Sequence, residues 1–284
     1  MLTMRSVIRG LATDWRQSYS PEAAKSFLQK FAGGQVRLEK DEGKGVAKIV
    51  LDHQEKKNAF SGKMMVDLEA AVTDLESWGT GRLVIVEGAG SDFCTGGDLS
   101  FMKAIANSND AYMMNKFMGS TLRRLRQLPL VSIANGYGFA LGGGSEVYTT
   151  CDIRAAKTGF KVGYVQGRLG VSPGWGGTAK IADTVGRARA IEFLATAKVL
   201  DIKTAVDAGL INFVYDDPKE FDAYIQKFTK NSVQAVRGAK LCISNSVDAG
   251  VNHEAQEAAD REVFTSLWGS KGHLDAVAQN LKHK

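Results

Sequence analysis

Residues 128–147, LPLVSIANGYGFALGGGSEV, decide the fold, because a buried strand here runs straight into a series of glycines. The apolar run LVSIANG is typical of a strand buried on both faces, and a helix is predicted after the glycines. Gly142, Gly143 and Gly144 stand at the junction, although glycine costs helix stability. Glycine there lets the backbone come close to a ligand, and the start of the helix offers unpaired N–H groups.

A second turn of this kind occurs in LVIVEGAGSDFCTGGDL, at residues 83–99. Here too a buried strand ends in glycine and leads into a helix, which Asp98 is predicted to cap. Two such turns side by side could aim two N–H donors at one oxygen, forming an oxyanion hole for a thioester carbonyl that becomes an enolate. A third glycine loop, SPGWGGT at residues 172–178, supports this interpretation, although glycines in single turns also serve tight packing.

The order of the elements predicts an α/β core followed by helices alone. Two extended runs, at residues 36–40 and 46–52, are separated by the hairpin-like turn DEGKG, and a helix with Ser61 as its N-cap follows. Strands then alternate with helices as far as INFVYDD, and nearly everything from Pro218 is predicted to be helical. We therefore divide the chain into an N-terminal extension (1–34), an α/β core (35–215) and a C-terminal helical region (216–284).

The composition excludes several classes of protein. The 284 residues are 44% hydrophobic and 24% charged, and no run of 18 uninterrupted apolar residues predicts a membrane span. The net charge of +5 is mild and unclustered, which argues against nucleic acid but suits a small anionic ligand. Three scattered cysteines, Cys94, Cys151 and Cys242, favour the cytosol. An acid-poor, arginine-containing start before Asp14 leaves the mitochondrion as the alternative.

Other nucleotide and nucleophile motifs fit less well. GYGFALG has wider glycine spacing than a dinucleotide fingerprint, and Asp152 follows too soon to be its acidic residue. No glycine loop ends in Gly-Lys-Ser/Thr, as a P-loop does. Ser145 lacks the flanking glycine of a nucleophile elbow, because Val147 stands in that place. The four histidines form no ligand pattern, so no metal is predicted.

Taken together, these motifs resemble the crotonase (enoyl-CoA hydratase/isomerase) superfamily from about Val36 to the C-terminus. The matching strings, in the superfamily's order and spacing, are KKNAFSGKMM, DFCTGGDL, LPLVSIANGYGFALGGGSE, CDIRAA and LGVSPGWGGT. The resemblance implies an α/β fold, a crotonase-like spiral of ββα units, with a C-terminal helical region that helps to build homotrimers or hexamers. It also implies an acyl-CoA ligand and no separate cofactor, CoA being part of the substrate.

The resemblance assigns the site residue by residue. The oxyanion-hole donors fall on the backbone N–H groups of Gly97 and Gly143. The segment that lies along the CoA moiety falls on Lys56, Lys57, Asn58 and Ala59. Lysine there also suits a phosphate-rich ligand, while a solvated charge pair is the alternative interpretation. Further contacts with the CoA ester are predicted for Gly96, Asp98 and Trp175.

Two acidic positions bear on the reaction. Hydratases of the superfamily use two glutamates to handle water and the α-proton, and the first falls on Glu146. The second falls four residues before Gly170, where this chain has Gln166. Glutamine has no ionisable proton to transfer near neutral pH, so an efficient two-acid hydratase is not expected. Hydrolysis, isomerisation and decarboxylation remain.

Four further stretches narrow this choice: SPGWGGT with its Trp175, FTSLWGSKGHLDAVA, NAFSGKMMVDLE and KFAGGQVRLEKDEGKGVA. They look most like a metabolite-repair branch of the superfamily that decarboxylates ethylmalonyl-CoA and, less well, methylmalonyl-CoA. Such esters arise from carboxylation side reactions, and the branch returns them to butyryl-CoA or propionyl-CoA. The alternatives are a hydratase or isomerase of an unsaturated acyl-CoA, or a homologue that binds CoA esters without turnover.

Decarboxylation suits the residues at hand. Loss of CO₂ leaves a thioester enolate that the oxyanion hole stabilises, and the thioester is itself the electron sink, so no metal or biotin is needed. Glu146 is the first candidate for positioning or protonating the substrate, either protonated itself or driving the substrate carboxylate into an apolar pocket. Trp175 is predicted to form part of that wall, or simply to fill the loop. Tyr164 and Gln166 are predicted to contact the carboxylate.

Overall fold

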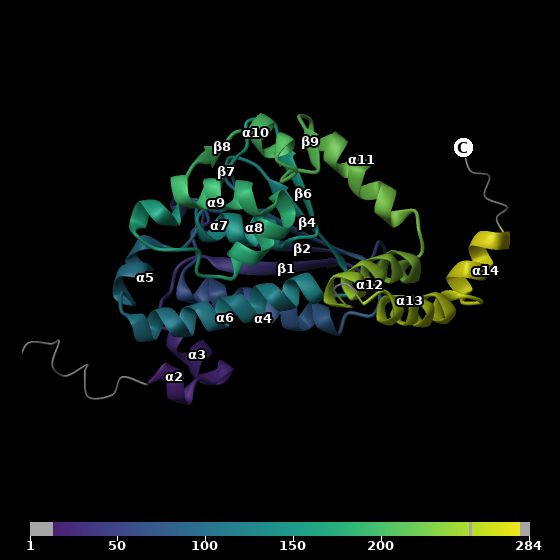
Figure 1. Cartoon of the computed structure of the whole chain (residues 1–284), viewed down its shortest axis with the longest axis horizontal. Helices are drawn as coiled ribbons and strands as arrows, with labels where there is room; N and C mark the ends of the chain where they lie inside the picture. Colours follow the sequence, from purple (N-terminus) through teal and green to yellow (C-terminus); the bar gives the residue numbers. More distant parts are fainter. Residues whose placement is uncertain (1–13, 250–251, 279–284) are drawn as a thin grey trace, which may run out of the picture.

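A computed structural model describes residues 14–249 and 252–278, in which helices surround two β-sheets (Figure 1). The larger sheet has the strand order β1-β2-β3-β4-β6-β9. The hairpin of β1 and β2 is antiparallel, and all the other neighbours in this sheet are parallel. Its strands are β1 (Gln35–Asp41), β2 (Val46–Asp52), β3 (Leu83–Gly88), β4 (Val131–Gly136), β6 (Ile153–Lys157) and β9 (Phe213–Tyr215). The predicted α/β class and the predicted hairpin are confirmed.

A smaller sheet, absent from the sequence-based prediction, lies beside the glycine turns. It contains β5 (Phe139–Leu141), β7 (Lys161–Gly163) and β8 (Val199–Leu200), in that order. Strands β5 and β7 are parallel, whereas β7 and β8 are antiparallel. Strands of two or three residues are too short to show a hydrophobic period, so their sequence carries no strand signal.

Both faces of the larger sheet are covered. Neighbouring residues of a strand point to opposite faces, so Val84 and Val86 of β3 lie in the main core, whereas Leu83 and Ile85 pack in a second cluster with Phe221. The main core is completed by α4 (Gly62–Glu76) and α6 (Ser108–Gln127), and Phe221 belongs to α11 (Pro218–Thr229). Ser61 caps α4 as predicted, because its hydroxyl accepts a hydrogen bond from the Met64 N–H (3.2 Å).

The described part of the predicted N-terminal extension belongs to the main core. It forms α2 (Trp15–Ser18) and α3 (Pro21–Leu28), which lie below α6 and α4 in Figure 1. Trp15 and Leu28 are buried in that core. Ring contacts also run from Trp15 through Phe27 and Phe31 to Phe101 of α5 (Leu99–Ala104), with successive centroids 5.6, 5.4 and 5.0 Å apart. Residues 14–34 are thus packed with the residues that follow them; residues 1–13 lie outside the described ranges.

The remaining helices are short ones around the glycine loops and a C-terminal group. The first set comprises η2 (Gln54–Lys56), α7 (Gly143–Thr150), η3 (Val165–Leu169), α8 (Gly177–Val185), α9 (Arg187–Thr196) and α10 (Ile202–Asp207). The second comprises α12 (Val233–Ala249), α13 (His253–Leu267) and α14 (Lys271–Ala278), at the opposite end from α5 in Figure 1. The predicted helical character of this region is confirmed for its described residues. Within residues 14–249 and 252–278, no helix has the length and hydropathy to cross a membrane.

Candidate active site

The glycine turns that follow β3 and β5 meet at one place. The N–H of Leu141 donates to the carbonyl of Cys94 (2.9 Å), which joins the two turns through their backbones. Gly142 then adopts a φ of 55°, in the left-handed region that glycine tolerates, and α7 begins at the next residue. A Cβ atom on Gly96 would lie only 3.2 Å from the backbone nitrogen of Gly143, so the turns are in direct contact.

The two predicted donors lie in these turns. Among the hydrogen bonds of the described residues, neither the N–H of Gly97 nor that of Gly143 donates to a protein acceptor. Gly143 is the first residue of α7, where an N–H has no partner within the helix. The first turn is fixed by Phe60, whose N–H donates to the Gly96 carbonyl (2.7 Å) and whose carbonyl accepts from the Asp98 N–H (2.8 Å). The arrangement can therefore direct two N–H groups at one oxygen.

The carboxyl group of Glu146, in the first turn of α7, is buried and accepts four hydrogen bonds. Its Oε2 atom accepts from the backbone N–H groups of Trp175 (2.8 Å) and Gly177 (2.7 Å). Its Oε1 atom accepts from the N–H of Gly174 (3.1 Å) and from Nε2 of Gln166 (3.0 Å). Glu146 therefore joins α7 to the third glycine loop, the one that precedes α8.

Burial raises the pKa of Glu146 above the usual carboxyl value, and hydrogen bonds from Gly177, Trp175, Gly174 and Gln166 oppose that rise. All four of these neighbours present N–H groups, which solvate a carboxylate. Each carboxyl oxygen already accepts two of them. All four hydrogen bonds of the carboxyl group thus come from the protein itself, which the sequence did not predict because three of the four donors are backbone atoms.

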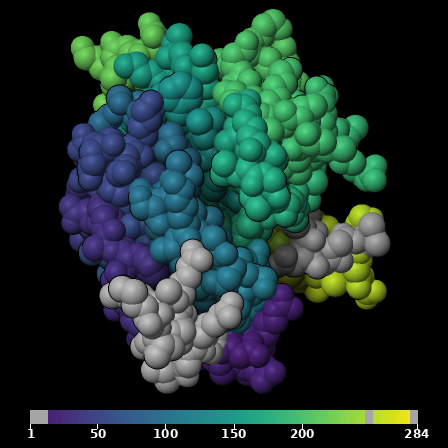
Figure 2. All heavy atoms as spheres, turned by 90° about the vertical axis from the view of Figure 1, so that its left-hand side faces the viewer, coloured from purple at the N-terminus to yellow at the C-terminus, as the bar shows by residue number. Residues whose placement is uncertain are grey.

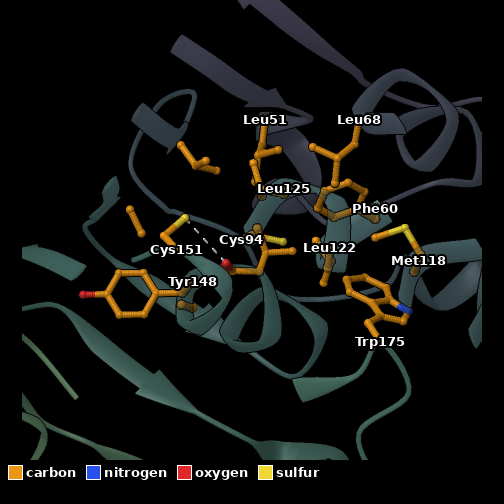
Figure 3. Packing of buried hydrophobic residues seen from close by; sticks show 14 of the residues in the cluster. Leu51, Phe60, Leu68, Cys94, Met118, Leu122, Leu125, Tyr148, Cys151 and Trp175 are labelled. Carbon is orange, nitrogen blue, oxygen red and sulfur yellow. Dashed lines mark hydrogen bonds between the residues drawn. The ribbon is translucent and has the colours of Figure 1, made fainter. Parts of the chain in front are cut away.

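Trp175 is 3% exposed, and its indole lies on the second turn, at Gly143. Its ring packs edge-on against Phe60, with centroids 5.5 Å apart and an interplanar angle of 77°. A Cβ atom on Gly143 would lie 2.3 Å from the ring atom Cζ3 of Trp175, so the indole rests on the backbone of that glycine. Figure 3 shows the indole with Phe60 and Met118 beside it. The side chain thus forms an apolar wall next to the Gly143 N–H; Phe60, its partner, was not singled out from the sequence.

Tyr164 and Gln166 lie at the beginning of η3, and both side chains are buried. The Oε1 atom of Gln166 and the hydroxyl of Tyr164 have no hydrogen-bond partner of normal geometry, although the Thr149 side chain lies beside that hydroxyl. Buried polar atoms usually have a partner, so these two are suited to contact a polar group of a ligand. The structure therefore brings Tyr164, Gln166 and Glu146 together.

The predicted CoA segment lies against the first turn. The N–H of Thr95 donates to the carbonyl of Lys57 (3.1 Å), next to Gly96. Lys56 and Lys57 are exposed, and the Lys57 ammonium group lies 5.2 Å from the ring centroid of Phe139. Both lysines can therefore reach a ligand that enters beside this turn. Figure 2 shows this end of the molecule, where a furrow separates the blue surface from the green one.

Three other predicted contact residues are used within the protein. The Asn58 side chain is fully buried, and its amide donates to the carbonyls of Ala89 (2.8 Å) and Asp92 (2.7 Å). The Ala59 carbonyl is hydrogen-bonded to the His53 ring (2.7 Å). The Asp98 carboxylate caps α5, as predicted, by accepting from two N–H groups of that helix (2.8 and 3.0 Å). These residues shape the two loops from within.

Lys180 of α8 is a buried cation that sequence reasoning did not single out. Its Nζ atom donates to the hydroxyl of Thr150 (2.7 Å), the last residue of α7. A cation at the C-terminal end of a helix interacts favourably with the helix dipole. Burial lowers the pKa of Lys180 to about 8, and the charge of Arg126 acts in the same direction. An isolated lysine within an apolar helix offers no sequence signal, because its burial depends on α7.

Replacing Lys180 by methionine tests this lowered pKa. The unfolded chain holds the lysine proton up to about pH 10.4, whereas the folded protein releases it near pH 8, so the wild-type free energy of unfolding should rise across that interval. Relative to Lys180→Met, we expect a rise of about 3 kcal/mol in urea unfolding series from pH 7.5 to 10.5. Exposed Lys103→Met is the control. A constant difference between wild type and Lys180→Met would contradict the prediction.

Comparison with known proteins shows what the chain is similar to. Residues 41–276 match the family model of enoyl-CoA hydratase/isomerase. The ethylmalonyl-CoA decarboxylase of Gallus gallus is 36% identical over 270 residues, covering 93% of this chain and 90% of that protein. The protein of the same name from Danio rerio is 33% identical over 294 residues, covering 100% and 97%.

Solved structures agree on the architecture. An enoyl-CoA hydratase from Thermoplasma volcanium superposes with a TM-score of 0.79 at 27% identity, covering 87% of this chain and 97% of that one. A Thermobifida fusca protein in complex with acetoacetyl-CoA superposes with a TM-score of 0.72 at 25% identity, covering 84% and 96%. The spiral architecture expected from the sequence motifs is therefore confirmed.

Proposed function

The chain belongs to the enoyl-CoA hydratase/isomerase family, and we propose that it is an acyl-CoA decarboxylase acting on ethylmalonyl-CoA and, less well, on methylmalonyl-CoA. The observation that carries the proposal is the pair of N–H groups of Gly97 and Gly143 in turns that touch each other. In addition, Gln166 stands where a hydratase has its second acid. The name shared by relatives at 33–36% identity supports the choice of substrate.

In this mechanism the thioester carbonyl oxygen accepts from Gly97 and Gly143. The bond between the α-carbon and the carboxylate breaks, CO₂ leaves, and the electron pair passes into the thioester to give an enolate. The two N–H groups stabilise the oxygen as its charge grows, and one such donor is worth about 3 kcal/mol. The enolate then takes up one proton, giving butyryl-CoA or propionyl-CoA. The reaction needs no cofactor, because the thioester accepts the electron pair.

The apolar wall accounts for release of CO₂. The Trp175 indole lies on Gly143 and touches Phe60, so a carboxylate placed there loses part of its hydration. Loss of hydration destabilises a carboxylate more than neutral CO₂, which favours bond cleavage. The Tyr164 hydroxyl can donate a hydrogen bond that orients the carboxylate, whereas the free Oε1 atom of Gln166 can only accept a hydrogen bond, from an O–H or N–H group of the ligand or from water. Lys56 and Lys57 meet the phosphates of CoA.

A homotrimer or hexamer in the cytosol is part of the same proposal. Exposed apolar side chains on the C-terminal helices support self-association, among them Ile243, Phe264, Trp268 and Leu274. The three scattered cysteines support a reducing compartment. A role in metabolite repair follows if the substrate is the product of a carboxylation side reaction.

A panel of CoA esters tests the function. Purified protein should release CO₂ from ethylmalonyl-CoA in the presence of EDTA and avidin, faster than from methylmalonyl-CoA. Crotonyl-CoA, followed by loss of its enoyl absorbance, serves as the comparison. Hydration of crotonyl-CoA at a comparable rate would contradict the proposal, and so would tight binding of the esters without turnover.

A further inference from the structure

The Glu146 carboxyl group faces the third glycine loop, and that loop fixes its geometry. Three of its four donors are backbone N–H groups of Gly174, Trp175 and Gly177. A Cβ atom on Gly177 would lie 2.5 Å from Cγ of Glu146, so the loop backbone packs directly on the glutamate side chain. Glu146 is 1% exposed, and each of its carboxyl oxygens already accepts two hydrogen bonds from the protein, so the group is not available to contact a substrate.

The loop of residues 174–177, which is hydrogen-bonded to Glu146, places the Trp175 indole on the turn that contains Gly143. The Trp175 N–H itself donates to Glu146 Oε2, and its indole rests on Gly143. The same indole touches Phe60, whose backbone is bonded on both sides of Gly97. The Trp175 side chain therefore lies on Gly143 and touches Phe60, the residue that holds the turn of Gly97, and its backbone is anchored by the carboxyl group of Glu146.

We propose that Glu146 is a positioning residue: its carboxylate fixes the backbone of residues 174–177 and so holds the Trp175 indole against the oxyanion hole. It neither donates a proton to the enolate nor contacts the substrate. Gly143 and Glu146 lie in the same first turn of α7. That turn therefore positions both the Gly143 N–H and, through Glu146, the Trp175 wall beside it. This inference rests on the proposed function for the consequence in turnover, but the position of Trp175 can be tested without any reaction.

Fluorine NMR of protein labelled with 5-fluorotryptophan tests that position. The chain has four tryptophans, Trp15, Trp78, Trp175 and Trp268, and the Trp175 resonance is the one missing from Trp175→Phe. In Glu146→Gln and Glu146→Ala, we expect that resonance to shift or broaden while those of the buried Trp15 and Trp78 stay in place, which shows that the fold is retained. Glu69→Gln, which alters a buried carboxylate on α4, is the matched control and should leave the Trp175 resonance unchanged. An unmoved Trp175 resonance in both Glu146 variants would overturn the proposal.

A double-mutant cycle then separates positioning from proton transfer. We expect Glu146→Gln to lower kcat about 30-fold and Trp175→Ala about 100-fold, because misplacement of a group by 1 Å costs on that order. If Glu146 acts through Trp175, the double variant should lose about 100-fold and no more. It should also keep the wild-type dependence of kcat on pH. A loss of about 3,000-fold, or removal of one limb of the pH profile, would assign proton transfer to Glu146 instead. Absence of CO₂ release from every ester would defeat the proposed function, while the fluorine spectra would still decide the position of Trp175.

Discussion

Gly143→Ala is expected to lower kcat for CO₂ release about 10²- to 10³-fold, the loss seen when one oxyanion-hole donor is removed. The new Cβ atom would lie 2.3 Å from Cζ3 and 2.5 Å from Cη2 of Trp175. Because that ring is buried against Phe60, the Gly143 backbone has to move, and its N–H then no longer points at the thioester oxygen. Rates of CO₂ release under saturating ethylmalonyl-CoA provide the measurement.

Gly119→Ala is the matched control for this substitution. Gly119 is a helical glycine in α6, and a Cβ atom there would meet nothing within 4 Å. Alanine also favours a helix, so the control should keep its activity and gain slightly in stability. Wild-type turnover in Gly143→Ala, with the thermal stability unchanged, would remove the Gly143 N–H from the mechanism.

Gln166→Glu should lower kcat about 10²- to 10³-fold at pH 8. It places a second carboxylate where the Gln166 Nε2 atom now lies, 3.0 Å from Glu146 Oε1. Two carboxylates at that distance cannot both stay ionised without large cost, so the charged pair should push apart and displace the loop with Trp175. Like charge raises the pKa of the new carboxyl group, and below that pKa its O–H can donate to Glu146 as the amide does. The loss should therefore shrink as the pH falls, which a kcat profile from pH 5 to 9 measures.

Gln166→Met, with similar volume and no charge, separates charge from packing. It loses one hydrogen bond, so its smaller decrease in kcat, about 10-fold, should not vary with pH. A profile of Gln166→Glu that is parallel to wild type would contradict the prediction. Crotonyl-CoA hydration by Gln166→Glu is informative too, since a second acid is what the hydratases of the superfamily possess.

Local signals in the sequence predicted much of the fold. The β1–β2 hairpin, the Ser61 and Asp98 caps and the two strand-to-helix turns all depend on neighbouring residues, and all are present. The contact between the two turns was expected from their repetition, and a backbone hydrogen bond from Leu141 to Cys94 provides it.

Features formed by distant backbone atoms could not be predicted in this way. Glu146 accepts hydrogen bonds from backbone N–H groups within residues 174–177. Every residue type except proline has such a group, so the sequence does not indicate which ones will bind the carboxylate. Its assignment as a proton donor was open from sequence and is hard to reconcile with a carboxyl group that already accepts four hydrogen bonds. The smaller sheet, the buried Lys180 and the packing of Trp15 likewise depend on elements far away in the chain.

The row of aromatic rings from Trp15 to Phe101 constrains how this chain can be shortened by proteolytic maturation. Phe101 belongs to α5, which begins directly after Asp98 and hence two residues after the donor Gly97. Cleavage after Trp15 would remove that residue from the core, and cleavage after Phe31 would remove Leu28 as well and the ring that packs on Phe101 of α5. A shortened form that keeps this row of rings intact must therefore retain the chain from Trp15 onward.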